Sequence, residues 1–213
     1  VWQEYREGCA DGLSYSQFCM RYQRYRDSLG LVARRDHRAG ERMFVDFSGD
    51  GIDIIDPITG EVCVATLFVA VLGASNYTYV EPVLHEDLPT WIQCHINAFN
   101  FFSGVAEITV PDNLKSGVTR PDYYEPDLNP TYAALAEHYK TAVIPARVRR
   151  PRDKAKVEQG VLLAERWIIA VLRHRRFHNL VDVRAAVREL NIKLNDRPMQ
   201  KLAYSRRELF EAI

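Results

Sequence analysis

Features that mark several protein classes are missing from this sequence. Only four of its 213 residues are cysteines, and no two of them form a Cys-x-x-Cys pair. This pattern argues against a disulfide framework or a zinc site and predicts reduced thiols in a cytosolic protein. The longest apolar run, residues 62–74, is too short to cross a bilayer as a helix. A glycine-rich phosphate loop and a Ser-His-Asp or Cys-His set are also missing.

The start of the chain lacks two familiar signals. No secretory signal precedes the first predicted helix, and the first residue is valine rather than methionine. The length suits one sizeable domain with a small appendage. We therefore expect the sequence to be a piece of a longer protein.

Charge is balanced overall but separated along the chain. Residues 1–40 hold 7 basic and 5 acidic side chains, residues 41–140 hold 4 and 15, and residues 141–213 hold 17 and 8. The basic part suits a polyanion such as DNA. The alternative is that two halves of one domain neutralise each other.

The first 29 residues predict two helices joined by a short turn. Ser14 and Gln17 are spaced as a capping box at the start of the second helix, in which arginines alternate with tyrosines. The pair is either the last part of a helix-turn-helix that binds DNA through Arg21 and Arg24, or an αα-hairpin that only links domains.

The pattern after a polar linker at residues 30–40 predicts an α/β domain over residues 41–198, in the order β-β-β-α-β-α-β-α-α. Apolar and alternating runs predict strands at 43–47, 62–73, 76–84, 106–110 and 142–146. Helical spacing predicts helices at 88–102, 131–140, 154–176 and 180–194. Residues 116–130 form a proline-rich loop, and residues 199–213 begin a basic, irregular C-terminal region.

One short stretch, FVDFSGDGIDIIDP at residues 44–57, contains four aspartates. Asp50 and Asp56 lie beside glycines and a proline, where turns favour Asp, so we expect a turn after the first strand. Asp53 falls in a short alternating strand and is expected to face water. Asp46 stands in an otherwise apolar strand, where a carboxylate is costly unless it is paired or binds a metal.

Two further carboxylates are candidates to join Asp46. Asp112 directly follows the fourth strand in ITVPDN, and Glu158 lies one turn into a long helix in RPRDKAKVEQG. The predicted order can bring all three to one point, where they could hold two divalent cations, and Mg²⁺ prefers such oxygen ligands. Alternatively, Asp112 belongs to a plain turn and Glu158 to a solvated helix face, with Asp153 and Glu165 as rival carboxylates.

These motifs carry a family resemblance. GERMFVDFSGD, VPDNLKSGV and RPRDKAKVEQGV resemble the IstA-type transposases of two-component insertion sequences, within the DDE transposase and retroviral integrase superfamily. GLSYSQFCMRYQRYR and LNDRPMQKL resemble that family as well. The resemblance implies an RNase H-like fold with a mixed five-stranded sheet. It also implies a catalytic triad of Asp46, Asp112 and Glu158 that holds two Mg²⁺ ions, with Mn²⁺ as a substitute.

The resemblance also implies partners and a cellular place. The implied partners are transposon-end DNA, target DNA, an AAA+ ATPase helper and further copies of the chain in a homo-oligomer on DNA. The implied location is the bacterial cytoplasm, and the nucleoid when DNA is bound. The family also has further N-terminal and C-terminal regions. Two other functions stay open: a nuclease of the same fold that cuts without joining, and a decayed DNA-binding protein.

The sequence departs from the family pattern in one spacing. Forty-five residues separate Asp112 from Glu158, a longer gap than is usual, and the loop at 116–130 can absorb the difference. Asn113 orients Asp112 or a bound water, or makes a turn hydrogen bond. The predicted phosphate contacts, with a solvated basic loop as the alternative, are Arg149, Arg150, Arg152, Lys154 and Lys156.

Overall fold

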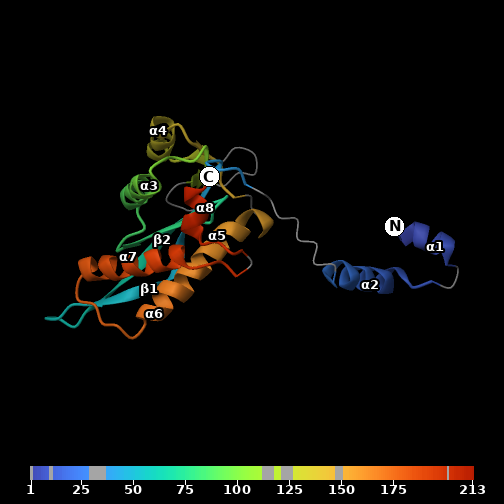
Figure 1. Cartoon of the computed structure of the whole chain (residues 1–213), viewed down its shortest axis with the longest axis horizontal. Coiled ribbons are helices and arrows are strands. Elements are labelled where there is room, and N and C mark those ends of the chain that lie inside the picture. Colours follow the sequence, from blue (N-terminus) through green and yellow to red (C-terminus); the bar gives the residue numbers. More distant parts are fainter. Residues whose placement is uncertain are drawn as a thin grey trace. The chain divides into compact units, whose positions relative to one another are not determined.

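The computed structural model describes residues 2–9, 12–28, 37–111, 118–120, 127–146, 151–200 and 202–213. Its chain divides into two compact units, residues 1–36 and 37–213 (Figure 1). No helix in these described ranges is long and apolar enough to cross a membrane. The predicted boundaries at residues 29, 40 and 198 stay predictions.

The first unit contains the two predicted helices, α1 (Trp2–Gly8) and α2 (Tyr15–Ser28). The Gln17 backbone N–H donates to Ser14 Oγ at 3.4 Å, and the Ser14 N–H donates to Gln17 Oε1 at 3.3 Å, so the expected capping box is present. The rings of Tyr5 and Phe18 hold the helices together, with centroids 5.0 Å apart. Arg21 and Arg24 are exposed on α2, and their contact with DNA stays a prediction.

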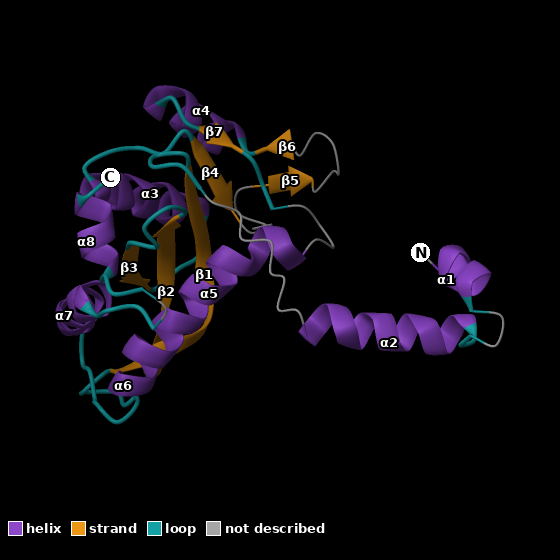
Figure 2. Cartoon of the chain, turned by 45° about the vertical axis from the view of Figure 1, so that its right-hand side comes forward, coloured by secondary structure: helices purple, strands orange, loops and turns teal. Residues whose placement is uncertain are grey.

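The second unit is built on a mixed five-stranded sheet with the strand order β3-β2-β1-β4-β7 (Figure 2). Its strands are β1 (Arg42–Ile55), β2 (Val62–Leu72), β3 (Thr78–Val83), β4 (Ile108–Pro111) and β7 (Ala142–Val143). The first three strands are antiparallel neighbours, whereas β4 runs parallel to both β1 and β7. Two short strands, β5 (Val118–Arg120) and β6 (Asp127–Leu128), pair separately within the predicted proline-rich loop.

Helices cover both faces of this sheet. They are α3 (Leu88–Phe102), α4 (Pro130–Tyr139), α5 (Pro151–Ala164), the π-helix η1 (Glu165–Ile169), α6 (Ala170–Leu172), α7 (Leu180–Asp196) and α8 (Arg206–Glu211). The bounds of α3 agree with the prediction because its ends are marked in the sequence: the Asp87 side chain accepts the Thr90 N–H at 3.0 Å, and Ser103 ends the helix in the left-handed conformation.

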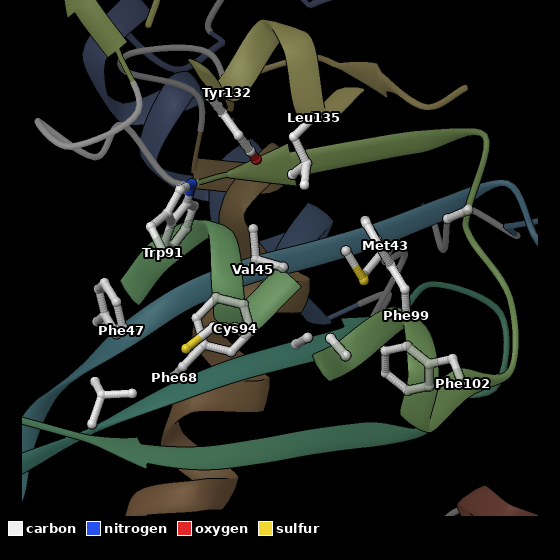
Figure 3. Packing of buried hydrophobic residues seen from close by; sticks show 14 of the residues in the cluster. Met43, Val45, Phe47, Phe68, Trp91, Cys94, Phe99, Phe102, Tyr132 and Leu135 are labelled. Atoms are coloured by element: carbon white, nitrogen blue, oxygen red, sulfur yellow. The ribbon is translucent and has the colours of Figure 1, made fainter. Parts of the chain in front are cut away.

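Successive side chains of β1 point to opposite faces of the sheet, and each face has its own hydrophobic core. Met43, Val45 and Phe47 belong to the core on the side of α3 and α4, where Phe47 lies beside the fully buried Trp91 and Met43 lies beside Phe99 (Figure 3). The opposite side of the sheet packs against α5, η1 and α7 in a second core. Burying one ring of this size contributes roughly 4–6 kcal/mol, at about 25 cal/mol per Å² over 150–250 Å².

A buried histidine ties α3 to α4 inside the first core. His95 Nδ1 lies 2.8 Å from the Trp91 carbonyl oxygen, and its Nε2 lies 3.1 Å from the Tyr132 hydroxyl. These partners fit a neutral ring that donates from Nδ1 and accepts the Tyr132 O–H at Nε2. Complete burial lowers the pKa of His95 to about 4, because desolvation disfavours the charged ring.

The expected turn after the first strand is wrong, because β1 continues through it. Three residues of β1 face one residue of β2 between the pairs Phe47–Phe68 and Gly51–Thr66, so the irregularity is a bulge. Ser48 Oγ accepts the Leu67 backbone N–H at 3.0 Å, which replaces a lost ladder bond. The turn at Asp56 is confirmed, since its Oδ1 accepts two backbone N–H groups.

Two helical predictions also need correction. Residues 199–213 are not wholly irregular, since Ser205 and Glu208 form a capping box that starts α8, whose Phe210 packs on the first core. The long helix begins at Pro151 rather than residue 154, passes through a π-helical turn from Glu165 and ends at Leu172.

Candidate active site

The parallel pairing of β1 with β4 sets the level of the candidate site. Val45 lies beside Pro111, the last residue of β4. In the sequence, Asp46 follows Val45 and Asp112 follows Pro111. Backbone bonds fix this register at the start of β4: the Glu107 N–H donates to Gly40 O at 2.8 Å. Asp112 itself lies outside the described residues.

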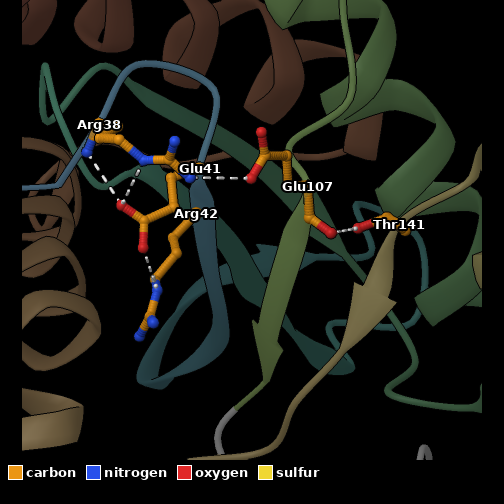
Figure 4. A network of polar contacts seen from close by, with 5 residues as sticks. All are labelled: Arg38, Glu41, Arg42, Glu107 and Thr141. Atoms are coloured by element: carbon orange, nitrogen blue, oxygen red, sulfur yellow. Dashed lines mark hydrogen bonds and ion pairs between the residues drawn. The ribbon is translucent and has the colours of Figure 1, made fainter.

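A polar network at the other end of the same strands supports that register (Figure 4). Arg38 reaches across to Glu107 at 3.5 Å, and Arg42 Nε lies 3.1 Å from Glu41 Oε1. The Arg38 backbone N–H, together with the two guanidinium groups, lowers the pKa of Glu41. Because Thr141 also bonds to the Glu107 carbonyl, the network spans β1, β4 and the start of β7.

Asp46 is the only ionisable residue among the first residues of β1 that lie between Arg42 and Asp50. Its side chain is half-buried, and its Oδ1 accepts the Phe47 N–H at 2.9 Å. Phe44, two residues earlier, lies on the same face of the strand because side chains alternate. That face carries α5, as Figure 2 shows with α5 crossing β1.

A glycine brings α5 down onto the sheet. A Cβ at Gly160 would lie 2.4 Å from Val71 Cγ2, closer than any real side chain allows, so only glycine fits this approach. Gly160 is buried, while Glu158, two residues earlier, is exposed. The contact therefore fixes the height of α5 above β2 within one turn of Glu158.

A small apolar cluster joins the three elements that carry the predicted triad. Phe44 of β1, Val110 of β4 and Val161 of α5 pack together beside Ala146. Each predicted carboxylate lies two or three residues in sequence from one of these packed residues. Asp46 and Asp112 each come two residues later in the sequence, and Glu158 lies three residues earlier on the helix. The cluster thus places β1, the end of β4 and the second half of α5 at one point.

Other predicted site residues fall partly outside what the structure describes. Asn113, Arg149 and Arg150 are among the residues not described, as is Asp112. Helix α5 includes Arg152, Lys154 and Lys156, whose side chains are not described. Among the described side chains, no three His, Cys, Asp or Glu residues form a group that could hold a metal ion.

The described side chains do bear on the rival carboxylate Glu165. This residue shares a helix face with Glu158, but it lies further along, with Oε1 4.0 Å from where a Cβ of Gly49 would stand. Asp46, Glu158 and Glu165 are all described, and they do not form a metal-binding group. Glu165 Oε1 therefore lies beside the bulge of β1, and the choice of Glu158 over Glu165 stays a prediction.

Sequence reasoning missed two packing contacts that build this site. The close contact of Gly160 with β2 depends on a distance between segments far apart in the chain, and a lone glycine in a helical pattern signals it only weakly. The packing of Phe44 with Val110 and Val161 has a clearer signal, because each stands at a fixed step from a candidate carboxylate.

Comparison with known proteins gives the site a context. No family model matches the chain. All of it aligns at 45% identity with "Putative transposase y4bL/y4kJ/y4tB" of Sinorhizobium fredii. It also aligns in full, at 44% identity, with "Putative transposase for insertion sequence IS408" of Burkholderia multivorans. The chain is a homologue of insertion-sequence transposases. It spans about two fifths of the length of these relatives, 41% and 42% respectively.

Solved structures share the fold of this transposase homologue. The HTLV-2 integrase catalytic core domain in complex with magnesium superposes with a TM-score of 0.60 at 14% identity, covering 83% of this chain and 99% of that one. A chain of the simian T-cell lymphotropic virus intasome gives a TM-score of 0.62 at 13% identity, covering 84% and 57%. The likeness confirms the predicted α/β fold with a mixed five-stranded sheet and flanking helices.

Proposed function

We propose that this chain is the catalytic core of a DDE transposase that cuts DNA at a transposon end and joins the freed end to target DNA. One observation carries the proposal: the cluster of Phe44, Val110 and Val161 joins the three elements that bear Asp46, Asp112 and Glu158. Asp46 lies in β1, Asp112 directly follows the parallel neighbouring strand β4 in the sequence, and Glu158 lies on α5, which packs over β1 and β2.

Charge explains why cations belong at this point. Three carboxylates together would repel a phosphodiester, so the site can accept DNA only if positive charge lies between them. The donor set fits Mg²⁺, with Mn²⁺ as a substitute, since all three ligands are hard carboxylate oxygens. Two such ions supply charge stabilisation at both the attacking and the leaving oxygen. Asp46, Asp112 and Glu158 would hold them.

The proposed reaction has two displacements at phosphorus. In the first, water attacks a phosphodiester at the transposon end, and the bond from phosphorus to the 3′ oxygen breaks, which leaves a 3′-OH and a 5′-phosphate. In the second, that 3′ oxygen attacks a target phosphodiester and displaces the target's own 3′ oxygen. One phosphodiester forms as another breaks, so joining needs neither a nucleotide cofactor nor a covalent protein intermediate.

The protein's own groups position these steps. The Phe47 N–H holds Oδ1 of Asp46 at 2.9 Å, which orients the carboxylate on its strand. In the proposal, Asn113 holds Asp112 or a bound water, and Arg149, Arg150, Arg152, Lys154 and Lys156 contact DNA phosphates at the start of α5. The partners are the two DNAs, further copies of the chain and an AAA+ ATPase helper, in the bacterial cytoplasm.

An isosteric substitution tests the triad. We expect Asp112→Asn to reduce both cutting and joining at least ~100-fold, because stabilisation of transition-state charge through bound metal is worth several kcal/mol. DNA binding and thermal stability should stay at the wild-type level. Asp50→Asn, the same change at an exposed position of β1 away from the candidate site residues, is the matched control and should leave activity unchanged.

The metal itself is tested by crystallography. We expect anomalous peaks from a Mn²⁺ soak between Asp46, Asp112 and Glu158, and we expect them to disappear in Asp112→Asn. An active Asp112→Asn protein would refute the triad. Cutting without joining by the wild type would instead support the nuclease of the same fold.

A further inference from the structure

A second basic feature lies at the far end of β1, away from Asp46. A groove of about 450 Å³ separates the last residues of β1 from the end of α6 and the loop that follows it. Arg173, His174, Arg175 and Arg176 line one side, and Asp53 lines the other along with apolar residues. All four basic-side residues are exposed.

Most of this positive charge is not used within the described part of the chain. Arg173 donates to the Ala170 carbonyl at the end of α6 and so serves the helix terminus. Arg175 stacks over Phe177, 4.9 Å from the ring centroid. Among described residues, no carboxylate lies within 4.0 Å of the Arg175 or Arg176 guanidinium. Lys193 and, at longer range, Arg175 lower the pKa of the exposed Glu189, and both guanidinium groups remain able to bind an external anion.

The loop is held in place before any ligand arrives. Phe177 is 1% exposed in the second core and pairs with Ile54 in a parallel bridge. The Ile55 N–H donates to the Phe177 carbonyl at 2.9 Å, and His178 Nδ1 lies 3.0 Å from the Ile55 carbonyl oxygen. Because the backbone is already ordered, binding an anion here costs little conformational entropy.

The position of the groove relates it to the candidate active site. Along the helix, Leu172 comes 14 residues after Glu158, or roughly 21 Å at 1.5 Å per residue. Along β1, Asp53 comes seven residues after Asp46, which gives roughly 17–23 Å depending on the length taken up by the bulge. A separation of roughly 20 Å corresponds to about six base pairs of duplex DNA at 3.4 Å each.

We propose that this groove binds the phosphate backbone of target DNA about six base pairs from the phosphodiester at the carboxylates. The inference rests on the proposed function. Target DNA is the occupant because the groove offers exposed arginines, whose charge is complementary to phosphate oxygens, at a distance from the candidate carboxylates. A substrate without a fixed sequence must be held through its phosphates.

A double substitution, Arg175→Gln with Arg176→Gln, tests the proposal in the full chain. We expect joining of a precut end to a mixed-sequence target duplex to fall roughly tenfold, while cutting at the end is unchanged. The salt dependence of target binding, measured in Ca²⁺, should lose about two units of slope, since each phosphate contact contributes about 0.9. Arg188→Gln with Lys193→Gln removes the same charge from exposed positions of α7 outside the groove and should change neither.

Insertion positions give a second readout. The wild type should disfavour insertion within about six base pairs of a target end on one side, and the double variant should lose that bias. An equal fall in cutting and joining, or joining equal to that of the control variant, would overturn the inference. If the wild type neither cuts nor joins, the proposed function fails, and the salt slope alone still decides whether these arginines contact DNA.

Discussion

The contact between Gly160 and Val71 gives the sharpest test of how the fold positions the site. An alanine Cβ at residue 160 would lie 2.4 Å from Val71 Cγ2, whereas carbon atoms in contact need about 3.5–4.0 Å. Something must therefore move by roughly 1.1–1.6 Å. Val71 is 2% exposed and β-branched, so it has little freedom to turn away, and we expect α5 to rise from the sheet.

The expected effect on stability is small, but the effect on activity is large. Overpacking lowers the free energy of unfolding by about 1–3 kcal/mol, whereas replacing glycine by alanine within a helix raises it by about 1 kcal/mol. Glu158 is two residues away, and a displacement of about 1 Å can cost roughly 100-fold in rate. Gly160→Ala should therefore keep a near-native melting temperature and lose roughly 100-fold in DNA cutting.

Two variants make this prediction decisive. Val71→Ala removes the clashing methyl group, so the double variant Gly160→Ala with Val71→Ala should recover most of the cutting rate. Gly104→Ala is the control, because its new Cβ would meet nothing closer than 4.0 Å. Full activity of Gly160→Ala, or no recovery in the double variant, would show that the close approach of α5 does not position Glu158.

Four further outcomes are expected. Glu158→Gln should abolish cutting while Glu165→Gln retains it, and the reverse result in a metal-dependent cutting assay would move the third carboxylate to Glu165. Because burial lowers the pKa of His95 to about 4, below its unfolded value near 6.5, stability should be full above pH 6.5. It should fall as pH drops toward 4, by up to about 1.4 kcal/mol per unit. Urea titrations should show this fall, and Tyr132→Phe, which removes a partner of His95, should lower stability by about 1–2 kcal/mol at pH 7.5. Ser205→Ala should cost about 1 kcal/mol of unfolding free energy through the lost cap of α8, and an unchanged midpoint would contradict that role.

Local signals explain how much of the fold could be predicted. The span of α3 followed from helical spacing. The predicted edge strands were too long by three residues each, since β3 is Thr78–Val83 rather than 76–84 and β7 is Ala142–Val143 rather than 142–146. The turn expected at residues 48–51 failed because a hydroxyl group, Ser48 Oγ, takes over the Leu67 N–H and lets β1 continue. A serine followed by Gly-Asp-Gly has the composition of a turn, so sequence alone could not show this.

The candidate site was predictable for a different reason. Asp46 stood out because it is a carboxylate in an apolar strand, and its proposed partners were suggested by their positions after a strand and at the start of a helix. The support beneath them was not predictable, because the contact of Gly160 with Val71 joins segments about 90 residues apart. A helix pattern shows which face is apolar, but not how closely the helix approaches a sheet.

The late position of α5 in the chain has a consequence during protein synthesis. Asp46 leaves the ribosome more than 100 residues before Glu158, and the sheet that carries Asp46 is complete once β7 has been made. Domains fold as their segments emerge, so a stalled or truncated product that ends before residue 158 can contain most of the sheet but never the third carboxylate. If the proposed function is right, every such fragment is unable to cut DNA. The cutting centre forms only when α5 packs against a sheet whose strands have already been made.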